Sequence, residues 1–251
     1  MFWSCIRPRL NIALPSTHQH DISQIFEVAC TENCISSIGE DSSTVKIPFL
    51  NEDSCGFFAL YEGHRNGYVA SRTASLSFDE FLRKAIASHG PASDLRSCFE
   101  TAYAQTDKLI ERAALDRGTS AIAFMIRKHE NNLRLYFSNV GCSRAILCRG
   151  SSSILLSEEH APKSDVESAR LASSSAYGRT SIQIRQLLTC TRALGDHLFK
   201  DWMISTPYYM DCDLTADDSA IICISSNLAD LVSDEEIVDL SQGHISTIAA
   251  S

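Results

Sequence analysis

Residues 121–156 read AIAFMIRKHENNLRLYFSNVGCSRAILCRGSSSILL and carry the clearest secondary-structure signal in the chain. The apolar runs in this segment are typical of β-strands, and they come in two pairs. The first pair is residues 121–126 and 133–140 around the polar turn 127–132, and the second is residues 145–148 and 154–156 around the turn 149–151. Two such runs joined by a short polar turn indicate a β-hairpin. Two hairpins in succession predict antiparallel sheet rather than alternating βαβ units.

Apolar runs on either side of this segment predict two more strands. Residues 56–61, GFFALY, form a short aromatic run that ends abruptly at Glu62-Gly63-His64. Residues 220–225, AIICIS, form a second run of the same kind. Short continuous apolar runs suit strands that are buried on both faces. We therefore expect both segments in the interior of the sheet structure, with a functional turn at residues 62–64.

Helices are indicated at four places. Serine and glutamate three positions apart match a capping box, which marks a helix start, at Ser77 with Glu80, Ser164 with Glu167, and Ser233 with Glu236. Residues 94–116 give a stronger signal, because their apolar residues recur at the spacing of one buried helix face. Residues 173–175, three serines, are typical of a loop, and there is no internal repeat or Pro/Gly/Ser-rich linker. The sequence predicts one α+β domain over residues 1–251.

Composition narrows the class of protein. The 251 residues are 44% hydrophobic and 21% charged, which is typical of a folded globular chain. No apolar stretch approaches the roughly 18 residues of a membrane span, and residues 1–14 are interrupted by Arg7, Pro8 and Arg9. The net charge of -9, with no cluster of Lys and Arg, argues against nucleic acid as a partner. We expect neither a membrane segment nor a signal peptide.

The ten cysteines are spread along the chain and lie mostly inside apolar runs. Such thiols behave as small hydrophobic side chains, which indicates a reducing, intracellular setting and leaves cytoplasm and nucleus equally open. Cys30 and Cys34, with His18 and His20 nearby, offer one alternative, a thiol-based metal or redox site. Their spacing fits no standard zinc motif, so buried structural thiols are the preferred interpretation.

Several catalytic patterns are absent. The sequence has no glycine-rich phosphate loop, and no cysteine is followed six positions later by arginine, the pattern of cysteine-dependent phosphatases. Gly141-Cys142-Ser143-Arg144-Ala145 departs from the GxSxG serine motif in its last residue and lies between two predicted strands. A hairpin segment is favoured over a nucleophile there.

Short segments between about residues 30 and 240 carry a family resemblance. They are FFALYEGH (57–64), GTSA (118–121), SNVGCSRA (138–145), EHAP (159–162), TRALGD (191–196) and ISSNLAD (224–230). In this order they resemble the motifs of the metal-dependent serine/threonine protein phosphatases of type 2C, which have DGHGG, GSTA, ANxGDSRA, DHKP, SRALGD and ASDGLWD at these places. The resemblance implies a four-layer α-β-β-α sandwich of two antiparallel sheets flanked by helices.

The resemblance also implies a metal centre at one end of the sandwich. In that family, carboxylates hold two Mg²⁺ or Mn²⁺ ions, and a bridging water attacks the phosphorus of a phosphoserine or phosphothreonine. Hard divalent cations require oxygen ligands, and a pair of them both activates the water and neutralises the developing charge. Carboxylates at the matching positions are therefore the test of activity.

At these positions the chain departs from the family. Glu40, Asp41, Glu62 and Gly63 are the remaining candidates for metal binding, with Glu62 one methylene longer than the family's aspartate. Two other ligand positions carry Cys142, a soft and mostly protonated thiol, and Asn227, a neutral amide. The family's last metal aspartate has no candidate, because no Asp or Glu follows Asp239. We expect a weak metal site or none.

Phosphate recognition is also expected to be lost. The distance between Glu40-Asp41 and Glu62 puts Ser36 at the position of the family's phosphate-binding arginine. No arginine occurs between Arg9 and Arg65, so no register of this segment supplies a bidentate guanidinium. His64, a proton donor candidate in the family's chemistry, is expected only to be hydrogen-bonded, and Arg192 and Asp196 are expected to hold a loop.

Three hypotheses for function follow. The preferred one is a catalytically inactive type 2C phosphatase-like protein, a pseudophosphatase, that binds a protein partner such as a kinase or a phosphoprotein. The second is a weak Mn²⁺- or Mg²⁺-dependent serine/threonine phosphatase that uses Asp41 and Glu62. The third is the thiol-based site described above. The resemblance further predicts a domain that is short at its C-terminus, and residues 1–25 are expected to be a flexible N-terminal extension.

Overall fold

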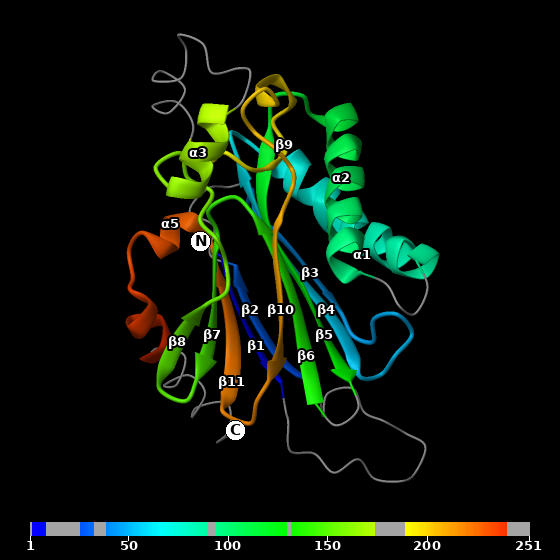
Figure 1. The fold of residues 1–251 in the computed structure, drawn as a ribbon, viewed down its shortest axis with the longest axis vertical. Helices are drawn as coiled ribbons and strands as arrows, with labels where there is room; N and C mark the ends of the chain where they lie inside the picture. The colour runs from blue at the N-terminus through cyan, green and yellow to red at the C-terminus, as the bar shows by residue number, and fades with distance from the viewer. Residues whose placement is uncertain are drawn as a thin grey trace.

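The computed structural model describes residues 2–8, 26–32, 39–89, 94–129, 132–173 and 189–239. Two antiparallel sheets pack face to face, and helices cover their outer faces (Figure 1). The predicted α+β sandwich of two antiparallel sheets with flanking helices is confirmed.

The larger sheet has six strands and contains the first hairpin predicted from the sequence. Its path runs β10-β6-β5-β4-β3, with β9 pairing to one end of β5. The strands are β3 (Ser42–Lys46), β4 (Cys55–His64), β5 (Gly118–His129), β6 (Asn132–Val140), β9 (Leu194–Gly195) and β10 (Tyr208–Leu214). Ala121 pairs with Val140 and His129 with Asn132, so β5 and β6 form a tight hairpin. Long strands β4 and β5 at the centre carry the residues that reach the candidate site.

The smaller sheet has five strands in the order β2-β1-β11-β7-β8. These are β1 (Phe2–Pro8), β2 (Phe26–Glu32), β7 (Arg144–Arg149), β8 (Ser152–Leu155) and β11 (Asp218–Ile224). The β7-β8 hairpin is the second one predicted, and β11 corresponds to the apolar run at residues 220–225.

The start of the chain differs from the flexible extension expected over residues 1–25. Residues 2–8 form β1, which pairs with β11 on one side and with β2 on the other. One pairing partner, β11, lies far along the chain, so the local sequence gives no signal of this pairing. Arg7 and Pro8 interrupt the apolar run in the sequence but fall at the end of the strand. Residues 9–25 lie outside the described part of the chain.

The two-residue alternation of the strands builds separate hydrophobic layers. In β4, Phe58 and Leu60 face the interior between the sheets, whereas Phe57 and Tyr61 face the layer below the helices. In β11, Ile221 belongs to the layer between the sheets and its neighbours Ala220 and Ile222 to the outer layer. Strands that contribute to a core on both faces read as continuous apolar runs. This explains why the runs at residues 56–61 and 220–224 are continuously apolar.

Two long helices, α1 (Tyr68–His89) and α2 (Leu95–Ala113), cover the six-stranded sheet (Figure 1). The helix predicted at residues 94–116 is confirmed, with Asp94 as its N-cap. The start predicted at Ser77 is wrong, because α1 begins at Tyr68 and Ser77 donates a hydrogen bond to the carbonyl of Thr73 within the helix. Small residues in the first turns of α1, including the fully buried Ala70, allow close approach to the sheet and lack the large apolar side chains that signal a helix.

The other two capping boxes do mark helix starts. In α3 (Asp165–Ser173), the backbone N–H of Glu167 donates to the Ser164 hydroxyl at 3.3 Å. Ser233 and Glu236 form a reciprocal pair of hydrogen bonds at the start of the helix over residues 234–239. This helix and the short α5 (Ser226–Ala229) cover the outer face of the five-stranded sheet.

A short 3-10 helix, η2 (His197–Phe199), follows β9 and leads toward β10. Among the helices of the described residues, none is both long enough and apolar enough to cross a membrane.

Candidate functional site

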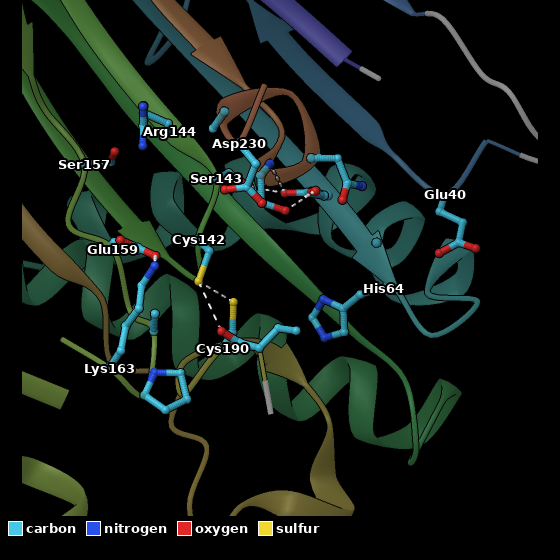
Figure 2. Close-up of a pocket in the computed structure, with 18 of the residues that line it drawn as sticks. Glu40, His64, Cys142, Ser143, Arg144, Ser157, Glu159, Lys163, Cys190 and Asp230 are labelled. Atoms are coloured by element: carbon cyan, nitrogen blue, oxygen red, sulfur yellow. Dashed lines mark hydrogen bonds and ion pairs between the residues drawn. The ribbon is translucent and has the colours of Figure 1, made fainter. Parts of the chain in front are cut away.

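A cleft of about 650 Å³ lies at one end of the sandwich. Its walls come from the end of β4, the turn between β6 and β7, the segment after β8, residues 189–190 and α5 (Figure 2). The lining side chains that bear on the chemistry are Glu40, Glu62, His64, Cys142, Ser143, Glu159, Cys190, Ser226 and Asn227. Segments that are distant in the sequence therefore meet at this point.

Most of the site residues predicted from the sequence come together in this cleft. Glu40, Glu62, Gly63 and His64 line it from one side, and Cys142 and Asn227 line it from others. Asp41 adjoins the cleft through Glu40 and is close enough to Glu62 to feel its charge. Ser36 and the alternative thiol site formed by Cys34, His18 and His20 lie outside the described residues, and Cys30 falls in β2.

Glu62 is buried, and both of its carboxylate oxygens accept hydrogen bonds from the protein. Strand β4 continues through Glu62 to His64, beyond the end predicted from the sequence. One carboxylate oxygen of Glu62 accepts hydrogen bonds from the Ser143 hydroxyl at 2.7 Å and the backbone N–H of Ser226 at 2.9 Å. The other oxygen accepts the Ser226 hydroxyl at 2.7 Å. The carboxylate thus ties together β4, the β6-β7 turn and the start of α5.

The ionised form of Asp41 is disfavoured beside Glu62. Burial, together with the negative charge of Glu62, raises the pKa of Asp41 from 3.8 to about 6. The backbone of Asp41's neighbour Glu40 lies close to Gly63, because a Cβ on Gly63 would come within 2.4 Å of the Glu40 carbonyl oxygen. A glycine at position 63 is therefore needed for this close approach. This close packing places Glu40 and Asp41 beside the end of β4.

Cys142 lies beside Cys190 at the wall of the cleft rather than beside an acidic partner. Gly141, at a φ of +97°, turns the chain after β6 and directs Cys142 to the cleft. The two free thiols have their sulfur atoms 2.7 Å apart, and Cys142 also lies 3.7 Å from the carbonyl oxygen of Thr189 (Figure 2). The hydrogen bond shared with Cys190, burial, and the negative charges of Glu159 and Glu62 raise the pKa of the Cys142 thiol well above its usual range. Cys142 is thus a neutral thiol at neutral pH.

His64 is hydrogen-bonded to a buried aspartate. Its Nε2 atom lies 2.6 Å from Oδ2 of Asp196, whose side chain has no exposed surface. Asp196 adopts a left-handed conformation with φ 53°, and the guanidinium of Arg65 lies 3.6 Å from its other oxygen. Gly118 must lack a side chain here, because a Cβ would lie 2.2 Å from Oδ2 of Asp196 and 2.6 Å from Nε2 of His64. The expected hydrogen-bonded role of His64 fits this geometry.

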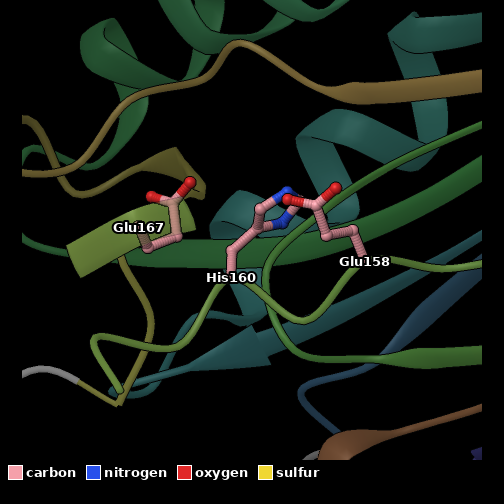
Figure 3. A group of neighbouring side chains, drawn as sticks. All are labelled: Glu158, His160 and Glu167. Carbon is pink, nitrogen blue, oxygen red and sulfur yellow. The ribbon is translucent and has the colours of Figure 1, made fainter. Parts of the chain in front are cut away.

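A second polar cluster, formed by Glu158, His160 and Glu167, lies outside the lining of the cleft (Figure 3). Each of the three offers a donor atom within 4.8 Å of the others, the spacing of a metal site. His160 is fully buried, and burial together with the charge of Arg192 lowers its pKa to about 4. The Nε2 atom of His160 has no hydrogen-bond partner, so this nitrogen is a free donor or acceptor.

Glu167, however, is already neutralised by arginines. Its carboxylate accepts Arg192 at 2.5 Å and 2.8 Å, Arg170 at 2.8 Å and the Thr191 hydroxyl at 2.7 Å. These interactions overcome burial and lower the pKa of Glu167 to about 2. Two guanidinium groups at this carboxylate repel a divalent cation, so the cluster holds a loop rather than a metal. Arg192 has the structural role expected from the sequence.

Most of the chain matches one known protein family. The family model described as protein phosphatase 2C matches residues 30–250. The chain belongs to the protein phosphatase 2C family. Its matched region contains both the cleft and the motifs that carried the resemblance.

Curated relatives in this family are named as phosphatases. "Probable protein phosphatase 2C 45" of Oryza sativa subsp. japonica is 28% identical over 81% of this chain and 71% of its own length. "Probable protein phosphatase 2C 14" of Arabidopsis thaliana is 24% identical over 79% of this chain and 44% of its own. "Protein phosphatase 2C homolog 1" of Saccharomyces cerevisiae is 23% identical over 80% of this chain. The matched part of the chain thus covers between 44% and 75% of the length of these three relatives.

Solved structures share the phosphatase 2C fold. A sex determining protein of C. elegans superimposes with a TM-score of 0.70 and 17% identity, covering 82% of this chain and 52% of that one. The serine-threonine phosphatase 2C of Toxoplasma gondii superimposes with a TM-score of 0.68 and 18% identity, covering 83% of this chain and 79% of that one. At these identities the likeness establishes the architecture.

The phosphatase 2C family uses Mg²⁺ or Mn²⁺, and the donor groups of this cleft do not fit such an ion. The Glu62 carboxylate already accepts three hydrogen bonds, one from Ser143 and two from Ser226. Cys142 offers a neutral sulfur, which hard divalent cations bind poorly. Within the described part of the chain, the carboxylates of Glu40, Asp41 and Glu62 do not form a group of donor atoms within 4.8 Å of one another. The family's metal chemistry therefore has no ready ligand set in this cleft.

Three residues that shape the cleft were not found from the sequence. Ser143 lies in the turn motif that carried the resemblance, and Ser226 begins α5, but serine is too common to signal a partner for Glu62. Cys190 was missed because its partner, Cys142, is 48 positions away and the two form no sequence motif. Only the folded chain brings these side chains together.

Proposed function

We propose that this phosphatase 2C family protein does not hydrolyse phosphate esters and acts by binding a protein partner. The observation that carries the proposal is the Glu62 carboxylate, which accepts three hydrogen bonds from Ser143 and Ser226. A metal ion at this position would have to displace donors that are already well placed. Each hydrogen bond to a charged group is worth roughly 1.5–3 kcal/mol, so the displacement is costly.

The neighbouring substitutions remove the charge that would offset this cost. Cys142 and Asn227 contribute no negative charge to the cleft, and Asp41 is partly protonated near neutral pH because its pKa is about 6. Mg²⁺ requires near-ideal octahedral oxygen ligands and gives up its waters reluctantly. With so few anionic ligands, binding in the cleft does not offset the loss of the ion's hydration shell. These features together support an inactive centre.

The charges of the cleft favour one kind of partner. Its lining carries four carboxylate side chains, Glu40, Glu62, Glu159 and Asp230, and only two strongly basic side chains. Both basic groups are paired with acids: Arg144 with Asp234 at 2.9 Å and Lys163 with Glu159 at 3.4 Å. Phosphorylated segments are repelled by such a surface, and basic segments are attracted. We therefore propose a protein partner with a basic docking segment, such as the basic surface of a kinase.

Hydrolysis assays test the enzymatic half of the proposal. Wild-type protein, Glu62→Ala and the surface control Glu111→Ala are assayed on p-nitrophenyl phosphate and a phosphothreonine peptide with millimolar Mn²⁺ or Mg²⁺. Glu111 is exposed on α2, away from the cleft. We expect no release of phosphate above buffer in any of the three proteins. Metal-dependent turnover that disappears in Glu62→Ala but persists in Glu111→Ala would refute the proposal.

Peptide binding tests the partner half. An arginine-rich serine peptide and its phosphoserine form are titrated into labelled wild-type protein and into Glu159→Lys/Asp230→Lys. The unphosphorylated peptide should bind wild type at low salt and weaken by about tenfold or more in the charge-reversed variant, because exposed charges act through long-range attraction. Tighter binding of the phosphoserine form by wild type would contradict the proposed partner chemistry.

One observation favours a second candidate, a weak Mn²⁺-dependent phosphatase. The raised pKa of Asp41 reflects in part the charge of Glu62, and a cation between the two would relieve this repulsion. Under this candidate, hydrolysis in Mn²⁺ would fall in Asp41→Asn as well as in Glu62→Ala. The assay above therefore separates the two candidates when Asp41→Asn is added to the set.

A further inference from the structure

Cys142 and Cys190 form a pair of thiols at the wall of the cleft. Their sulfur atoms are 2.7 Å apart, compared with about 2.05 Å for a covalent disulfide. Cys142 is partly exposed and lines the cleft, whereas Cys190 is 8% exposed and packs with Ala193 and Met203. The two side chains already point at each other in the reduced protein. None of the functions considered above uses this arrangement.

We propose that Cys142 and Cys190 are a redox modification site that is converted by a peroxide or a disulfide oxidant into an intramolecular disulfide. With hydrogen peroxide, the Cys142 thiolate attacks one oxygen, the O–O bond breaks, and a sulfenic acid and water result. The Cys190 sulfur then attacks the Cys142 sulfur and releases a second water. In total, two thiols lose two electrons and two protons, and the peroxide is reduced to two water molecules.

The surroundings favour a disulfide over a bound soft metal. Glu159 and Glu62 place negative charge near Cys142, which opposes the two thiolates that a metal would require. A disulfide carries no charge and escapes this repulsion. Within the described residues, no third Cys, His, Asp or Glu offers a donor atom within 4.8 Å of both sulfur atoms. A zinc-like site, which needs four ligands, is therefore incomplete here.

The position of the pair makes the oxidation specific. Among the residues whose side chains the structure describes, the other free cysteines are Cys55, Cys98, Cys148, Cys212 and Cys223, and four of these are buried. Cys212 is partly exposed in β10, and burial raises the pKa of its thiol. Oxidation requires both access and a neighbouring thiol, and Cys142 combines access with a sulfur 2.7 Å away. The low thiolate fraction of Cys142 makes the reaction slow at neutral pH and faster as pH rises.

The cross-link would join the β6-β7 turn to residues 189–190, which also line the cleft. The bond closes a loop between positions that are 48 residues apart. Closing a long loop restricts the unfolded chain and raises stability in the oxidised state. Oxidation thereby fixes two segments of the cleft lining, the β6-β7 turn and residues 189–190, relative to each other.

Mass spectrometry tests the proposal directly. Wild-type protein, Cys142→Ser, Cys190→Ser and the control Cys212→Ser are treated with hydrogen peroxide, alkylated and digested without reductant. Wild type and Cys212→Ser should lose the mass of two hydrogen atoms and yield a peptide that joins Cys142 to Cys190, with reversal by dithiothreitol. Cys142→Ser and Cys190→Ser should not form it. The proposal is overturned if wild type retains two alkylated thiols at these positions or pairs either with another cysteine.

Thermal unfolding supplies a second readout that does not depend on mapping. In wild type, the oxidised form should melt about 5–10 °C above the reduced form, given the length of the closed loop and the size of the chain. The two serine variants should melt at the same temperature under both conditions. Equal melting temperatures for oxidised and reduced wild type, together with a mapped disulfide, would show that the bond strains the cleft and would refute its stabilising role.

Discussion

Replacing Glu62 with alanine should destabilise the fold rather than stabilise it by removing charge repulsion. In an active metal centre, ligand carboxylates repel one another when no ion is bound, so removing one tends to be neutral or stabilising. Here Glu62 is 6% exposed and accepts hydrogen bonds from the Ser143 hydroxyl and from both the N–H and hydroxyl of Ser226. The sign of the change in the free energy of unfolding therefore distinguishes the two roles.

The expected magnitude follows from these contacts. Three hydrogen bonds to a charged acceptor, at roughly 1.5–3 kcal/mol each, give a gross loss of about 4.5–9 kcal/mol. Ser226 supplies two of the donors and water can enter from the cleft, so the losses do not add fully. Relief of the repulsion with the partly buried Asp41 returns about 1 kcal/mol or less. We expect a net loss of about 3–4 kcal/mol, or about 10 °C in melting temperature for a chain of this size.

Urea unfolding in metal-free buffer measures this change. Glu62→Gln, which keeps the shape and one acceptor oxygen, should lose about half as much, and the surface control Glu111→Ala should stay within about 0.5 kcal/mol of wild type. The ordering Glu111→Ala, Glu62→Gln, Glu62→Ala reports a structural carboxylate. If Glu62→Ala unfolds at the same or a higher urea concentration than wild type, the reasoning is refuted.

Three further predictions concern the surroundings of the cleft. Because the folded-state pKa of Asp41, about 6, lies above its ordinary 3.8, ionisation opposes folding, so stability falls as pH rises through this window. Asp41→Asn should therefore melt above wild type at pH 7.5 and show no gain below about pH 4; a gain that is equal at both pH values would contradict this assignment. Glu167→Gln should cost about 3–5 kcal/mol in urea unfolding, since it leaves Arg170 and Arg192 without their anion, and a loss below about 1 kcal/mol would count against that role. Gly118→Ala should move the His64 imidazole resonances in NMR spectra, because the new Cβ would lie 2.6 Å from its Nε2; unchanged resonances would argue against the pairing of His64 with Asp196.

Much of the fold could be predicted because its signals are local. The β5-β6 and β7-β8 hairpins are encoded by apolar runs around short polar turns, and α2 by its spacing and its Asp94 cap. Strand β1 could not be predicted in the same way, because its pairing partners are β2 and the distant β11. The start of α1 was missed because its first buried side chains are alanines and serines, which also occur in strands and loops.

The candidate site was predicted in part. Motif positions brought Glu40, Glu62, His64, Cys142 and Asn227 to one cleft, as the resemblance implied. What these groups do there was beyond the sequence, because it depends on side chains that meet only in the folded chain.

Glu62 and Cys142 illustrate this limit. In the sequence, Glu62 resembles a displaced metal ligand. In the structure, its oxygens accept hydrogen bonds from Ser143 and Ser226. In the sequence, Cys142 occupies the position of a lost metal ligand. In the structure, its sulfur lies 2.7 Å from that of Cys190. In both cases a neighbour from another part of the chain gives the side chain its role.

Titration of Mn²⁺ into metal-free protein, followed by calorimetry, tests the central claim most directly. The account predicts no saturable binding up to about 1 mM, a concentration equivalent to a binding free energy of about -4 kcal/mol, in wild type and in Glu62→Ala alike. Saturable binding at micromolar Mn²⁺ in wild type that is lost in Glu62→Ala and retained in Glu111→Ala would contradict the account, because it would make Glu62 a metal ligand rather than a structural acceptor.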